Sequence, residues 1–295
     1  MATAAVLDAR RTERRGQAYV ALAAIAWSSA GVLQRGVQAD AAAQVGVRAV
    51  FACVALFAYV AVAERGRVLA AWRAIGVAGV GVAAALAVAS AAFIVALNHT
   101  TVAHVLFIQA IAPVLAALLA RGFLGEPVPA RTTVAMATAL AGVAIMVGGP
   151  GGGDLAGDGL SLLMALAFAV SIVLSRHRRD VSMAPATCLA QVLLVVAFLP
   201  LANLGPLTGD DVVALGALGA GQIGLGLAFL TIGARLIPAA QVALISLLEV
   251  VLGPLWVWLS IGERPTAATL AGGAVVVVAV VIQARGRAPA PRALP

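Results

Sequence analysis

The sequence contains no lysine, since all 19 of its basic residues are arginine. A Walker-type ATP site requires the lysine of its Gly-Lys pair, so this chain holds no such site. Pyridoxal phosphate and retinal bind as Schiff bases of a lysine, so both are excluded as well. No other feature of the sequence indicates a cofactor.

Charge of either sign is scarce. Only 11% of the 295 residues are charged, whereas 63% are hydrophobic and the mean hydropathy is +1.07. Soluble domains have about 25% charged and about 45–50% apolar residues. The apolar runs are continuous rather than alternating, which excludes a membrane β-barrel. We therefore expect an all-α protein embedded in a lipid bilayer.

Cysteine is scarce too. The two cysteines, Cys53 and Cys188, lie inside apolar runs and lack the spacing of a metal or redox motif. The acidic residues and histidines form no cluster with metal-ligand spacing, and no nucleophile–base pair is recognisable. We therefore predict no metal site and no enzymatic activity.

Ten apolar runs are long enough to cross a bilayer as helices, at about 20 residues for each crossing. They cover 17–34, 42–62, 74–97, 101–121, 132–149, 158–175, 184–202, 211–234, 238–260 and 267–284. A polar segment, 1–16, precedes them, and a short tail, 286–295, follows. The Gly-rich segment 150–157 divides the chain into five-helix units at 17–149 and 158–285.

The distribution of arginine supports this count. With a cytoplasmic N-terminus, 16 arginines fall in cytoplasmic segments, Arg35 and Arg264 fall in outer loops, and Arg48 lies inside a helix. Cytoplasmic loops of membrane proteins carry such an excess of positive charge. We therefore predict that both termini are cytoplasmic and that the chain crosses a bacterial inner membrane. The net charge of +7 then sets topology and indicates no nucleic-acid partner.

The second half of the chain repeats the first at an offset of 137 residues. The pair Gly125–Glu126 falls on Gly262–Glu263, and each pair follows an apolar run and precedes a proline. Both pairs are interpreted as helix stops. Because each half holds an odd number of predicted helices, the halves lie in the membrane in opposite orientations. Inverted repeats are typical of secondary transporters, whose binding site lies near the membrane midplane.

The chain resembles the drug/metabolite transporter superfamily in its EamA-type branch. Trp27–Ser28–Ser29 is similar to the first-helix motif of that family, with Ser28 where glycine is usual. Pro113 followed by Gly125–Glu126 is similar to its fourth-helix motif. The resemblance implies ten helices and the export of amino acids or other metabolites, as in bacterial amino-acid exporters.

The ninth-helix motif departs from the family pattern. Glu249 followed by Gly262–Glu263 is similar to it, but the family has Glu-Pro where this chain has Glu249–Val250. The next proline is Pro254. We therefore expect helix breaks or hinges at Pro113 and Pro254 and leave the position of the second kink open.

Glu249 is the leading candidate for a functional residue. It lies about 16 Å into its helix at 1.5 Å per residue, and a carboxyl group at that depth usually faces a cavity or a partner. It could bind a substrate amine and carry a proton, or it could hold two helices together. The repeat places Gln109 opposite Ser246, so we expect Gln109, Ser246 and Glu249 to approach one another.

Other residues have two interpretations. Arg48 could clamp a substrate carboxylate, or its side chain could extend to the outer surface. His104 could line the cavity or serve as a hydrogen-bonded structural residue. Trp27, with Ser28 and Ser29, and Trp256 are candidates for the cavity wall.

Together these features predict a carrier with a central cavity between the repeats. An apolar cavity with hydroxyl, amide and carboxyl groups suits a small zwitterion, so we expect amino-acid export by alternating access. The alternatives are an exporter of cationic or amphiphilic drugs and a passive channel. The sequence leaves the oligomeric state open, a monomer included.

Overall fold

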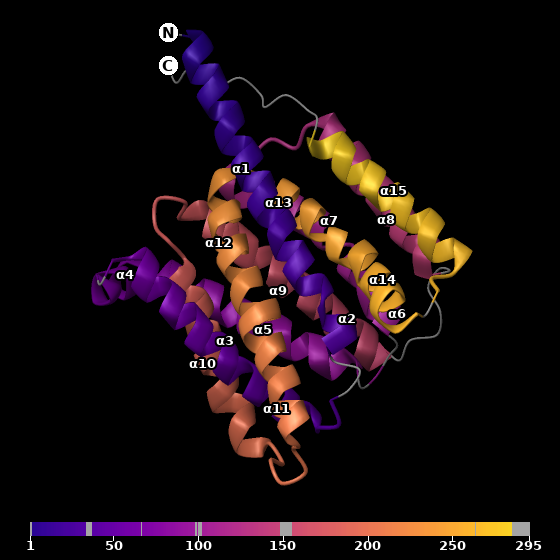
Figure 1. The fold of residues 1–295 in the computed structure, drawn as a ribbon. Coiled ribbons are helices and arrows are strands. Elements are labelled where there is room, and N and C mark those ends of the chain that lie inside the picture. Colours follow the sequence, from indigo (N-terminus) through magenta and orange to yellow (C-terminus); the bar gives the residue numbers. More distant parts are fainter. Residues whose placement is uncertain are drawn as a thin grey trace.

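The computed structural model describes residues 2–33, 37–65, 67–97, 99, 102–147, 155–262 and 264–284, and this part of the chain is helical throughout, without strands (Figure 1). Its first-half helices are α1 (Ala2–Ser28), α2 (Ala30–Leu33), α3 (Ala41–Ala63), α4 (Val68–Ala74), α5 (Gly76–Leu97), α6 (Val102–Gln109), α7 (Ala112–Leu124) and α8 (Ala130–Val147). Its second-half helices are α9 (Leu155–His177), α10 (Ala184–Phe198), α11 (Gly209–Gly216), α12 (Gly226–Leu236), α13 (Ala239–Ser246), α14 (Leu248–Ile261) and α15 (Ala267–Ala284). A 3-10 turn, Leu199–Leu201, follows α10, and a π-helix, Ala217–Leu225, joins α11 to α12.

Eight helical stretches in the described residues are long and apolar enough to cross a membrane. They are Ala41–Ala63, Gly76–Ala96, Phe107–Leu124, Leu155–His177, Ala184–Leu201, Gly209–Leu236, Ala239–Ser260 and Ala267–Ala284. The apolar helix Ala130–Met146 is shorter. The first expected span, 17–34, is not among them, because α1 ends at Ser28 and α2 at Leu33. The count of ten stays a prediction.

Two element boundaries differ from the sequence-based expectation. The described part of the polar segment 1–16 is helical and continuous with the first apolar run, since α1 begins at Ala2. The helix α9 begins at Leu155, inside the expected linker 150–157. Both extensions follow from local sequence, because alanine and leucine favour helix wherever no glycine or proline interrupts them.

The offset of 137 residues reappears in the helices. The helix α6 begins at 102 and α13 at 239, while α8 begins at 130 and α15 at 267. The helices α7 and α14 both end at a glycine in the left-handed region, with φ of 63° at Gly125 and 80° at Gly262. Glycine adopts this conformation without the steric cost that a Cβ atom would impose.

The equivalent helices α7 and α14 run in opposite directions. Glu126, just beyond α7, contacts Ala239 at the start of α13, whereas α14 starts where α13 ends. The start of α1 and the end of α15 lie at one end of the bundle, at the top of Figure 1. We call this the terminal end, and the other the opposite end.

Two close crossings shape the bundle. At the first, a Cβ atom on Gly219 in the π-helix would collide with the carbonyl oxygen of Arg48 in α3. At the second, each of Gly142 in α8 and Gly272 in α15 would place a Cβ atom against the carbonyl oxygen of the other. The helices α8 and α15 therefore lie side by side in backbone contact, at the right of Figure 1.

Candidate functional site

A cavity of about 780 Å³ lies between the two halves of the chain. Arg264, Pro265 and Thr266, in the connection between α14 and α15, line its mouth, so it opens at the opposite end. Its wall is largely apolar and includes Trp27, Phe93 and Phe168. The polar residues deeper in the wall are Ser28, Arg48, Ser90, Gln109, Gln191, Gln222 and Glu249. This volume is within the range of small-molecule sites in proteins.

Gln109 and Glu249 meet in this cavity. The amide Nε2 of Gln109 donates a hydrogen bond of 2.6 Å to Oε1 of Glu249. Gln109 is the last residue of α6, and Glu249 lies in the first turn of α14, so the bond links the two halves. The interruptions after α6 and before α14 bring both side chains to helix ends. A helix N-terminus, with its unpaired N–H groups, favours an acidic residue in the first turn.

Ser246 does not join this pair, contrary to the expected group of three. Its hydroxyl donates to the carbonyl oxygen of Val242 at 2.9 Å, one turn back in the same helix. The sequence argument assumed a continuous helix, which would place Ser246 and Glu249 on one face. The helix is interrupted at Leu247, and a serine inside a helix readily satisfies its hydroxyl within that helix.

Arg48 lies inside the protein and not at the outer surface. Only 6% of this residue is exposed, and it lines the cavity. Its Nη2 donates to the hydroxyl of Ser90 at 3.3 Å. The cavity therefore holds a buried guanidinium group and a carboxyl group, and these are complementary to an anionic and a cationic group on one ligand.

Trp27 and Ser28 contribute to the cavity wall. Trp27 packs edge-on against Phe168, with ring centroids 5.8 Å apart. Ser28 accepts a hydrogen bond of 2.8 Å from Nε1 of Trp256. Neither Trp256 nor Ser29 is among the described lining residues, and the Ser29 hydroxyl donates to Ala26 of its own helix. Trp256 thus reaches the wall only through Ser28.

The remaining candidates concern backbone breaks and one histidine. The helix α7 begins at Ala112 with Pro113 in its first turn, where a missing N–H is tolerated. The helix α14 runs without interruption through Pro254, so the expected break there is wrong. The break lies at Leu247, because a membrane helix can accommodate an internal proline. The side chain of His104 lies outside the described residues.

Sequence reasoning missed two amides in the wall, Gln191 of α10 and Gln222 of the π-helix. The Nε2 of Gln222 donates to the carbonyl oxygen of Trp27 at 3.3 Å, which fixes one side of the wall. A polar residue inside an apolar membrane run is itself a signal of function. That signal was present at both positions.

Comparisons with known proteins agree with this architecture. Residues 14–148 and 155–284 each match the EamA-like transporter family. A crystal structure of another protein is similar to 91% of this chain over 96% of its own length, with a TM-score of 0.77 and 20% identity. At that identity the likeness concerns the fold alone. No sequence among the curated proteins matches the chain.

Proposed function

Because this chain belongs to the EamA-like transporter family, and is therefore a multi-pass membrane transporter of the drug/metabolite type, we propose that it is a secondary carrier that exports amino acids. It works by alternating access through the central cavity. Its ten helices form two inverted repeats in a bacterial inner membrane, with both termini in the cytoplasm. The opposite directions of α7 and α14 support the inverted arrangement.

The observation that carries this proposal is the pairing of opposite charges in one apolar cavity. The Glu249 carboxyl group would bind a substrate ammonium group, with Gln109 holding it in place at 2.6 Å. The buried guanidinium of Arg48 would bind the substrate carboxylate. The aromatic and aliphatic wall would accept side chains of different size. An α-amino acid carries these two charges and one variable side chain.

Energy for export would come from a proton gradient, since the sequence holds no Walker site. Glu249 would carry the proton, because a carboxyl group that binds either a proton or a substrate amine couples the two by competition. The rival is a facilitator in which Glu249 only binds substrate or stabilises the interrupted helix.

The substrate test is exchange of labelled amino acids across proteoliposomes containing the purified protein. We expect saturable uptake of at least one amino acid and its loss in Glu249→Gln. The matched control is Glu13→Gln in α1, far from the cavity lining, which should transport normally. Uptake of a lipophilic cation without any amino acid would favour drug export. Flux that never saturates would favour a channel.

Proton coupling is tested by imposing a pH gradient and following substrate against its own gradient. The wild-type protein should concentrate substrate in one gradient direction. Glu249→Gln should abolish accumulation while retaining some exchange, and Glu249→Asp should retain part of the accumulation. A wild-type protein that never concentrates substrate, whichever way the gradient points, would leave the facilitator as the mechanism.

A further inference from the structure

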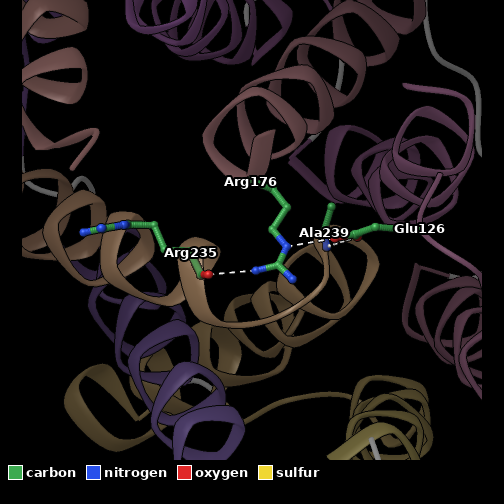
Figure 2. Close-up of polar contacts among 4 residues, drawn as sticks. All are labelled: Glu126, Arg176, Arg235 and Ala239. Carbon is green, nitrogen blue, oxygen red and sulfur yellow. Dashed lines mark hydrogen bonds and ion pairs between the residues drawn. The ribbon is translucent and has the colours of Figure 1, made fainter. Parts of the chain in front are cut away.

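A second polar cluster lies at the terminal end of the bundle, outside the cavity (Figure 2). The Nε of Arg176 donates to Oε1 of Glu126 at 2.8 Å, and its Nη1 donates to the carbonyl oxygen of Arg235 at 2.7 Å. The backbone N–H of Ala239 donates to Oε2 of Glu126 at 3.4 Å. Figure 2 shows Arg176 between the other two contacts, so one side chain connects both partners.

These four residues come from three places in the chain. Glu126 follows the glycine that ends α7, Arg176 lies in the last turn of α9, and Arg235 and Ala239 flank the connection from α12 to α13. The cluster therefore joins the first half to two elements of the second half. A contact of this kind resists separation of the halves at the terminal end.

The ion pair is largely withdrawn from solvent. The side chain of Arg176 is 12% exposed and that of Glu126 is 22% exposed. Exposed ion pairs contribute little to stability, but partly buried pairs with good hydrogen bonds are less screened and stronger. Glu126 also lies at the N-terminus of α13, where the helix dipole favours a carboxylate.

Behind the cluster, α7 and α13 are packed together. All eight residues of α13 are buried. Ala117 of α7 belongs to the same apolar cluster as Ala240 and Leu244 of α13. The terminal end of the bundle is therefore closed twice, by the apolar contact of α7 with α13 and by the Glu126–Arg176 pair above it.

The repeat relates this closed contact to the open end of the cavity. At an offset of 137 residues, α7 corresponds to α14 and α13 corresponds to α6. Glu249 and Gln109, which line the open cavity, lie on α14 and α6. Opening the terminal end would require α7 and α13 to separate, and the Glu126–Arg176 pair opposes that separation.

We propose that Glu126 and Arg176 form an ionic latch, which holds the terminal end closed while the cavity is open at the opposite end. The latch must release before the cavity can open toward the terminal end. This role rests on the alternating access proposed above. The predicted topology makes the terminal end cytoplasmic, so the latch controls entry of the exported substrate.

The test measures the accessibility of two reporter cysteines in a background with Cys53→Ala and Cys188→Ala. Ala243→Cys in α13 reports on the terminal end, because Ala243 is 1% exposed behind the latch. Val257→Cys in α14 reports on the cavity that it lines. An impermeant maleimide is added to inverted vesicles for the first reporter and to right-side-out vesicles for the second.

We expect Glu126→Gln and Arg176→Gln to raise labelling of the α13 reporter about tenfold, since a lost charged hydrogen bond shifts a two-state equilibrium by that order. Labelling of the α14 reporter should fall in the same variants. Arg176→Lys keeps the charge but not the two-pronged geometry, so it should give an intermediate value. The matched control is Arg178→Gln, which removes the exposed pair Arg178–Asp180.

Two outcomes would overturn the latch. Faster labelling of both reporters would mean that the substitutions only loosen the fold, and unchanged labelling would mean that the pair holds nothing closed. If Ala243→Cys does not fold, Ala120→Cys, buried in α7, replaces it as the reporter. Labelling does not depend on substrate, so a wild-type protein without flux would defeat the proposed function and leave this result readable.

Discussion

The helices α13 and α14 are two segments of one interrupted helix, yet their surroundings differ completely. Every residue of α13 is buried. In α14, Glu249, Gly253, Pro254 and Val257 line the cavity and are only partly buried. The interruption at Leu247 therefore marks the floor of the cavity. One stretch of sequence closes the protein at the terminal end and lines its opening at the opposite end.

In the first half the relation is reversed. The helix α7, which corresponds to α14, packs against α13, and buries Ala112, Pro113, Ala116, Ala117 and Ala120. Equivalent segments thus have opposite environments, although their bounds differ by the same offset. The difference teaches that packing depends on which end of the bundle is closed and not on the segment itself.

The strongest way to break the comparison is to enlarge one residue in each segment. Ala243→Phe in α13 should lower the free energy of unfolding by about 1–3 kcal/mol or more, because a packed site cannot accept a ring without strain. Val257→Phe in α14 should leave stability nearly unchanged and block flux, because its side chain faces the cavity. Thermal unfolding followed by fluorescence, together with flux, measures both. Equal destabilisation would contradict the difference in packing.

A second experiment compares the polar groups on the two sides of the interruption. Gln109→Leu should destabilise the protein by about 1–3 kcal/mol, since it leaves the Glu249 carboxyl without its partner. Ser246→Ala should change stability by less than about 0.5 kcal/mol, because its hydroxyl bonds within its own helix. Denaturant unfolding in detergent gives both values. A larger effect for Ser246→Ala would place Ser246, and not Gln109, at the centre of the site.

The smallest expected effect concerns the two tryptophans of α14. Trp256→Phe removes the indole N–H that donates to Ser28, which should cost about 1 kcal/mol and weaken apparent substrate affinity. Trp258→Phe is the matched control, because Trp258 is 40% exposed and is not among the cavity residues described. The melting temperature and the half-saturating substrate concentration report the two effects. Identical behaviour of the two variants would contradict a role for the Ser28 contact.

Some of the site could be predicted because the repeat carries spatial information. The offset of 137 residues brought Gln109 and the ninth helix together on paper before any contact was known, and the structure places Gln109 against Glu249. The composition predicted an all-helical chain for the same kind of reason. A periodic or repeated pattern survives translation into three dimensions.

Other features depended on choices that a sequence does not display. The sequence does not reveal that the Ser246 hydroxyl bonds back to Val242, or that the helix breaks at Leu247 and not at Pro254. Glu126 was interpreted only as part of a helix stop, because its partner Arg176 is fifty residues away. Such contacts arise from tertiary packing and carry no local signature.

The backbone crossing of Gly142 with Gly272 has a mechanical consequence. It joins α8 of the first half to α15 of the second with no side chain between them. Two rods held this closely can rotate about their contact point, but they cannot separate without losing it. Motion that parts α7 from α13 would therefore turn about this crossing as a fulcrum, with small displacement at the rim and large displacement at the centre.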